Sequence, residues 1–286
     1  MSMRAIFAIS LCLLVGVVVV FAFGRRLFVS SAPGGVTSAL ALPSRPPHRQ
    51  AQEGASATPA TASVACIQEA LGGVKVFASV SSLRIVGNTK VTATSTGFRP
   101  VANKREIGVV FPDRYKQSSV QTDAAPGAAP LTMVSGFKGN ELLTISARLP
   151  DDAVPKLMHA ARQGFVQQML MRLPRELADV RLSQRTTVDA GQERLAIDAF
   201  GPDDLAATLL VDPRTCSPVA LQYTAPSPTG PAKYRVDLSA YRRFGGILFP
   251  TLLRTTKDGE PYDEEYDSEI QVNAMLDDEY FRSIGR

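Results

Sequence analysis

The sequence predicts an α+β fold that consists mainly of antiparallel β-structure. Most of the second half alternates apolar and polar residues with a period of two, and turn residues recur every 10 to 15 positions. One long segment with helical spacing interrupts this pattern. About ten strands and one major helix are therefore expected.

Composition and charge limit the function classes. Of 286 residues, 45% are apolar and 20% charged, which allows a sizeable core and excludes a wholly disordered or collagen-like chain. The net charge is +4, but residues 1–63 contribute five arginines against one glutamate. The rest of the chain is neutral on balance, so no nucleic-acid partner is expected.

The N-terminal region, residues 1–28, is predicted to be a signal anchor or a signal peptide. Residues 5–23 carry no charge, and as a helix they would extend for about 28 Å, enough to cross a bilayer. A cleaved signal peptide usually has a shorter apolar core, so an uncleaved membrane span is the first interpretation. Arg25 and Arg26 follow the span, and the positive-inside rule alone would leave the remainder in the cytoplasm.

Residues 29–63 are predicted to form a disordered tether, because they are rich in Ser, Ala, Pro and Gly and nearly lack large apolar side chains. The folded domain is then residues 64–286. It holds two cysteines, Cys66 and Cys216, while Cys12 lies inside the apolar N-terminal run.

Cys66 and Cys216 form a candidate disulfide. Closing a loop of about 150 residues would contribute about 5 kcal/mol in the chain-entropy model, and such a bond persists only in an oxidising compartment. That compartment conflicts with the orientation that the positive-inside rule gives. Two separate buried thiols remain the alternative.

In the first half of the folded domain, a short helix is expected at Ile67–Leu71, followed by hairpins. Glycine-containing turns separate the predicted strands. These strands cover residues 74–86 and 90–96 around Gly87-Asn88, 106–111 before a Pro-Asp turn, and 131–136 and 141–146 around Lys138-Gly139.

The long helix is predicted from Asp151 to Leu173. Asp151 and Asp152 are favourable N-cap residues, Pro155 suits the first turn, and Pro174 ends the helix. An apolar stripe along it either packs on the sheet as ordinary core or forms a movable cover over an apolar cavity.

After the helix, alternation is most regular. The apolar positions of the predicted strands recur at every second residue. They are Leu195, Ile197 and Ala199; Leu205, Ala207, Leu209 and Val211; Val219, Leu221 and Tyr223; Tyr234, Val236 and Leu238; Ile247 and Phe249; and Ile270 and Val272.

Patterns that indicate catalysis or metal binding are missing from the sequence. There are two histidines, no CxxC or HExxH motif and no glycine-rich phosphate loop. The acidic run at residues 258–269 lacks the order of a calcium-binding loop and is expected to be a solvated hairpin. We therefore expect a protein that is not an enzyme, with no catalytic residues, metal site or cofactor.

Several segments in order resemble the outer-membrane lipoprotein-sorting superfamily, the LolA- and LolB-like proteins, from about Cys66 to Phe281. Each segment alone is only a strand with its turn, and their order and spacing carry the resemblance. They are Phe111–Gln117 (FPDRYKQ), Gly136–Gly139 (GFKG), Ala207–Thr215 (ATLLVDPRT), Tyr241–Pro250 (YRRFGGILFP) and Val272–Phe281 (VNAMLDDEYF).

This resemblance implies a curved, incomplete β-barrel with helices covering its open side and an apolar hollow that accepts acyl chains. The expected protein is a non-catalytic carrier for lipid or lipoprotein acyl chains. Candidate lipid-binding residues are Leu157, Met158, Phe165 and Met169 in the helix, and Leu209, Val211, Val236 and Leu238 in strands.

The expected location is the bacterial inner membrane with the domain facing the periplasm, or the periplasm itself if the leader is cleaved. Two other functions remain open at this point: an envelope scaffold that binds a protein partner through the curved sheet, and a hydrolase without a recognisable motif.

Overall fold

The computed structural model describes most of the folded domain. The described residues are 61–92, 100–125, 127–144, 149–150, 152–202, 204–227 and 230–282. The predicted N-terminal segment 1–28 and nearly all of the predicted tether lie outside them. Helix α1 begins at Thr61, so the last three residues assigned to the tether are helical.

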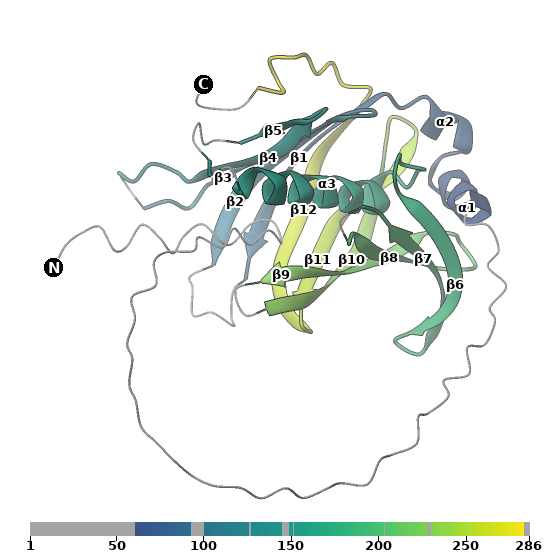
Figure 1. Cartoon of the computed structure of the whole chain (residues 1–286). Helices are drawn as coiled ribbons and strands as arrows, with labels where there is room; N and C mark the ends of the chain where they lie inside the picture. Colours follow the sequence, from purple (N-terminus) through teal and green to yellow (C-terminus); the bar gives the residue numbers. More distant parts are fainter. Residues whose placement is uncertain are drawn as a thin grey trace, which may run out of the picture. The chain divides into compact units, whose positions relative to one another are not determined.

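Twelve strands form a single sheet in which all neighbours are antiparallel. The order is β5-β4-β3-β2-β1-β12-β11-β10-β9-β8-β7-β6, so the first and last strands pair at its centre. Because β5 and β6 are the two ends of that order, the sheet is open (Figure 1). The predicted mainly antiparallel fold, an incomplete barrel, is confirmed, with twelve strands in place of about ten.

The strands have the following bounds: β1 Ser82–Val91, β2 Val101–Val110, β3 Arg114–Gln121, β4 Thr132–Lys138, β5 Glu141–Leu143, β6 Arg181–Asp189, β7 Gln192–Phe200, β8 Ala206–Val211, β9 Pro218–Ser227, β10 Gly230–Phe244, β11 Ile247–Lys257 and β12 Glu260–Val272. The alternation of apolar and polar residues did not predict β3 and β6. Their sequences, RYKQSSVQ and RLSQRTTVD, are mainly polar, so neither produces a clear apolar alternation.

The sheet curls at its β6 end. Asp189, the last residue of β6, lies 2.6 Å from the guanidinium of Arg235 in β10. These strands are four positions apart in the sheet, a separation of about 19 Å if the sheet were flat. The ion pair therefore requires this end of the sheet to bend strongly.

Helix α3, Ala153–Arg172, lies across the strands (Figure 1). It contacts β4 and β5 near one end of the sheet and β8, β9 and β11 toward the other. Its extent agrees with the prediction, although the Asp152 side chain pairs with Lys156 and does not cap the helix. None of the described helices is both long and apolar enough to cross a membrane.

Two predictions for the first hairpin are wrong. The segment expected to be a strand from Val74 begins as helix α2, Val74–Ala78, which buries Phe77 in the core. Gly87-Asn88 is also not a turn, because β1 continues through both residues and pairs with β2 and β12. The turn interpretation failed because glycine in a strand can also mark a bulge or a close approach of two chains.

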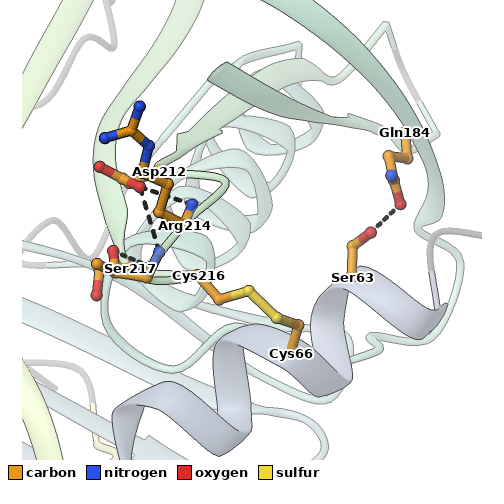
Figure 2. The surroundings of a disulfide bond; sticks show 8 residues. Ser63, Cys66, Gln184, Asp212, Arg214, Cys216 and Ser217 are labelled. Carbon is orange, nitrogen blue, oxygen red and sulfur yellow. Dashed lines mark hydrogen bonds between the residues drawn. A yellow bond between two sulfur atoms is a disulfide. The ribbon is translucent and has the colours of Figure 1, made fainter. Parts of the chain in front are cut away.

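A disulfide joins Cys66 of α1, Thr61–Leu71, to Cys216 in the turn between β8 and β9, with 5.8 Å between their Cα atoms (Figure 2). The Asp212 carboxylate accepts hydrogen bonds from the backbone N–H groups of Arg214 at 2.8 Å and Thr215 at 3.2 Å, which shapes this turn. The hydroxyl of Ser63 donates to Gln184 of β6, so α1 is held to the β8–β9 turn and to β6.

Candidate functional site

The face of the sheet that meets α3 is divided along its central strands. One half is apolar, because Ile85 of β1 pairs with Ile107 of β2 and Ile270 of β12. Four residues further along β1, Thr89 pairs with Asn103 and Glu265. Alternation along β1 and β2 keeps their side chains on one face, and a bulge in β12 opposite Val86 and Gly87 returns Glu265 to the face of Ile270. The change is therefore in chemistry and not in orientation.

A buried ionic network lies in the polar half and holds the end of α3. Arg172, in the last helical turn, is 0% exposed, and its Nε donates to Asp267 Oδ2 at 3.0 Å. Arg105 of β2 donates to Asp267 Oδ1 at 3.0 Å. Both guanidinium groups also donate to Glu265. We call these four residues the polar network; their two positive and two negative formal charges balance.

Burial raises the pKa of the Asp267 carboxyl, and the neighbouring Arg172 guanidinium opposes this effect. Charges in such surroundings are stable only when they are paired and hydrogen-bonded. The polar network therefore fixes the C-terminal end of α3 against β2 and β12.

Gly87 makes room for this network. It lies opposite both Arg105 and Asp267 in the sheet. A Cβ atom at this position would be 2.5 Å from the carbonyl oxygen of Tyr266 and 2.9 Å from Asp267 Oδ1. The close approach of β12 to β1 thus requires glycine here.

The prediction that the acidic run 258–269 is a solvated hairpin is wrong for its second part. Residues 260–269 lie in β12, where Asp263, Glu265 and Asp267 point to the α3 side. Glu264 and Tyr266 alternate with them and are exposed. The charges that compensate this run lie on β2 and α3, distant in sequence, so the local pattern gave no sign of them.

An open cavity of about 490 Å³ lies on the other flank of α3. It lies between α3, the β2–β3 and β4–β5 turns, the α3–β6 loop (residues 173–180) and the β7–β8 loop. Large apolar side chains contribute much of its wall. They are Phe111, Phe137, Phe165, Val166, Leu177, Val180 and Leu205. We call this space the aromatic cavity.

Phe165 of α3 is the centre of the ring cluster beneath the cavity. Its ring centroid lies 5.6 Å from that of Phe137, 5.7 Å from that of Tyr115 and 6.4 Å from that of Phe111. Such distances are those of favourable aromatic pairs. Burial raises the pKa of the Tyr115 hydroxyl, which donates to Gln117 at 2.8 Å and stays neutral. The rings therefore form an apolar, ordered surface.

Five charged residues also line the aromatic cavity, and they differ in exposure. Asp113, Arg162, Glu176 and Asp179 are exposed, whereas Arg175 is half-buried. The Arg175 guanidinium lies 4.2 Å from the centre of the Phe111 ring. The least exposed charge of the cavity wall is consequently positive.

The predicted lipid-binding residues do not all reach this cavity. Phe165 lines it. Met169, Leu209 and Val211, each 0% exposed, lie in the main core together with Val236 and Leu238. Met158 packs against that core and Leu157 is half-buried. The structure thus places most of these residues together, but in packed interior.

Sequence reasoning missed Phe111, Phe137 and Arg175 as cavity residues. Phe111 directly follows β2, Phe137 is the next-to-last residue of β4, and Arg175 follows the proline after α3. An aromatic residue at each of two turns was the available signal. Only the pairing of β3 with β2 and β4 brings these turns together.

Within the described residues, no group of three His, Cys, Asp or Glu side chains could hold a metal ion. His159 is half-buried at the wall of the aromatic cavity. The geometry provides an apolar surface with a cationic group beside it.

No protein-family model and no curated protein sequence matches the chain. Solved structures with similar folds include a LolA superfamily protein from Nitrosomonas europaea, which is 12% identical with a TM-score of 0.49 and covers 79% of this chain and 98% of that chain. A domain described as an outer membrane lipoprotein-sorting protein, from Vibrio parahaemolyticus, is 10% identical with a TM-score of 0.48, covering 78% and 97%. A DUF1329 family protein from Desulfovibrio piger is 10% identical with a TM-score of 0.45, also covering 78% and 97%.

Proposed function

We propose that this protein binds an acyl chain of a lipid or lipoprotein in the aromatic cavity and acts as a carrier without catalysing a reaction. The aromatic cavity itself is the observation that supports this proposal. Its volume of about 490 Å³ falls within the range of about 300–1,000 Å³ that is usual for small-molecule sites.

The energetic reason is the cost of exposing an acyl chain to water. Each CH₂ group contributes about 0.8 kcal/mol, so a palmitoyl chain in water costs about 12 kcal/mol. A wall of phenylalanine, valine and leucine side chains removes part of that cost without any reactive group. The second cavity against α3, of about 80 Å³, is lined by polar side chains such as Arg105, Gln117 and Glu265 and would not accept this ligand.

The cavity accommodates only part of a long chain unless the interior opens. We propose that the end of α3 away from Arg172 moves from the strands during loading, which opens a path for the acyl chain to Met169, Leu209 and Val211. Leu157, Met158, Val236 and Leu238 border the same path. Phe165 contacts the ligand before and after this movement.

The proposed location is the cell envelope, with the domain on the periplasmic side of the inner membrane. A disulfide between Cys66 and Cys216 supports an oxidising compartment. A phosphatase fused to the C-terminal end of the full chain should be active in cells, whereas activity of a reporter that works only in the cytoplasm would contradict this location.

Photo-cross-linking tests the binding site. Full-length protein is exposed to palmitic acid that carries a diazirine near its tail, and the cross-linked peptides are mapped by mass spectrometry. Labelling should concentrate on residues 111–113, 137–140 and 159–166. Leu177→Asp places a charge in the cavity wall and should lower this labelling about tenfold.

The control for Leu177→Asp is Val188→Asp, at an exposed site in β6 that does not line the aromatic cavity. It should leave the labelling unchanged. Equal labelling of all exposed peptides, or equal loss in both variants, would reject the cavity as a lipid site.

A further inference from the structure

Arg175 is the charged group that the proposed acyl-chain function leaves unexplained. An apolar tail needs no cation, yet this guanidinium is half-buried in the wall of the aromatic cavity. Burial lowers the pKa of Arg175 below its usual value, because a partly desolvated cation is unfavourable. A bound anion would remove that penalty.

The guanidinium is held in position but retains most of its hydrogen-bonding capacity. Its Nη1 donates to the carbonyl oxygen of Val80 at 3.2 Å, and its plane lies over the Phe111 ring. An arginine side chain has five N–H donors. Among the described residues, Arg175 forms no ion pair with a carboxylate. A ligand oxygen can therefore take the donors that remain.

The carboxylates of the cavity wall have only a weak electrostatic effect on a ligand inside the cavity. Asp113, Glu176 and Asp179 are all exposed, so solvent and salt weaken their effect inside. Arg162 is exposed like these carboxylates, so solvent and salt weaken its effect in the same way; it donates to Asn140 Oδ1 at 3.1 Å and lies 6.0 Å from the centre of the Phe137 ring. Both arginines thus lie beside phenylalanines of the ring cluster.

We propose that the aromatic cavity selects amphiphiles with an acyl chain and an anionic head group, a carboxylate or a phosphate, which pairs with Arg175. The tail lies against Phe111, Phe137 and Phe165, and the anionic oxygens accept N–H donors of the guanidinium. This selectivity rests on the proposed function, because it requires the acyl chain to occupy the same cavity.

The test compares ligands that differ only in the head group. Full-length protein is cross-linked with diazirine-bearing palmitic acid, and separately with hexadecanol that carries the same diazirine. A second pair, photoreactive phosphatidic acid and diacylglycerol, separates a phosphate source from a carboxylate source. In at least one pair, the anionic ligand should label residues 111–113 and 159–166 at about tenfold lower concentration than the neutral ligand.

Arg175→Gln should reduce the preference to less than about twofold by weakening the anionic ligand, with labelling by the neutral ligand unchanged. Lys156→Gln removes an exposed cation of α3 outside the cavity and should retain the preference. The comparison of acid and alcohol in the unchanged protein needs no variant, so it decides the question even if Arg175→Gln folds poorly.

Equal labelling by the anionic and neutral members of both pairs would overturn the head-group proposal and leave acyl-chain binding intact. Absence of cavity labelling by every ligand would reject the proposed function itself. Preference in only the fatty-acid pair, or only the phospholipid pair, supports the proposal and identifies the source of the anion.

Discussion

The two flanks of α3 meet the same sheet through different chemistry. On one flank, Arg172 enters a paired ionic network that borders a cavity of only about 80 Å³. On the other, Phe165 borders a cavity of about 490 Å³ lined by rings and loops. The polar network fixes one end of the helix, whereas the aromatic cavity leaves space for a ligand beside its middle.

A single helix across an open sheet can therefore be fixed at one end and border a ligand cavity along its middle. Paired charges in a buried site tolerate little displacement, because separating them leaves each without compensation. Apolar contacts are less directional and can be exchanged for contacts with an acyl chain. Movement of α3 should therefore begin at the end away from Arg172.

The largest effect is expected from Arg172→Met. This change leaves Glu265 and Asp267 with one arginine where they now have two, and loss of one partner of a buried ion pair costs about 3–5 kcal/mol. Chemical unfolding should detect a shift of this size. If the free energy of unfolding fell by less than about 1 kcal/mol, the polar network would not be what holds α3.

A smaller loss, of about 2 kcal/mol, is expected from Gly87→Ala, because the added methyl group forces β1 and β12 apart. The control is Gly164→Ala on α3, where the new Cβ would lie 3.6 Å from the Tyr115 hydroxyl, an ordinary contact. Thermal melting should separate the two variants. Similar melting temperatures would show that the network does not need the close approach at Gly87.

The pH dependence of Asp263→Asn should sharpen the description of the polar half. Burial raises the pKa of Asp263, while a hydrogen bond with Thr255 opposes the change. A raised folded-state pKa means that stability falls as pH rises from the unfolded value of about 4. Asparagine has no charge to bury, so the variant should gain stability relative to the original protein as pH increases above 4.

This pH effect should be at most about 1 kcal/mol, measured by urea unfolding at several pH values. A difference between the two proteins that stays constant with pH would mean that Asp263 has the same pKa in the folded and unfolded states.

The smallest effect is expected from Arg162→Met, the same substitution ten residues earlier on the same helix. Arg162 is exposed and its hydrogen bond is to Asn140, so the free energy of unfolding should change by less than about 0.5 kcal/mol. Unfolding under the conditions used for Arg172→Met gives the direct comparison. Equal losses in both variants would remove the distinction between the two flanks.

Local patterns predicted some parts of the fold correctly. The alternation at Leu195–Ala199 and Leu205–Val211 became β7 and β8, and the helix predicted from Asp151 to Leu173 differs from α3 by two residues at its start and one at its end. These features depend on neighbours within a few positions. Gly87, in contrast, has the local features of a turn residue, and its strand conformation depends on Asp267, far along the chain.

Composition and local patterns were sufficient to predict the β-rich class, the long helix, the absence of recognisable catalytic motifs and the two cysteines available for a disulfide. Only the folded chain shows that Arg105 and Arg172 neutralise Glu265 and Asp267, and that turns near Phe111 and Phe137 meet Phe165 around a cavity. Periodicity and capping depend on adjacent residues, whereas charge pairing and cavity shape depend on which strands become neighbours.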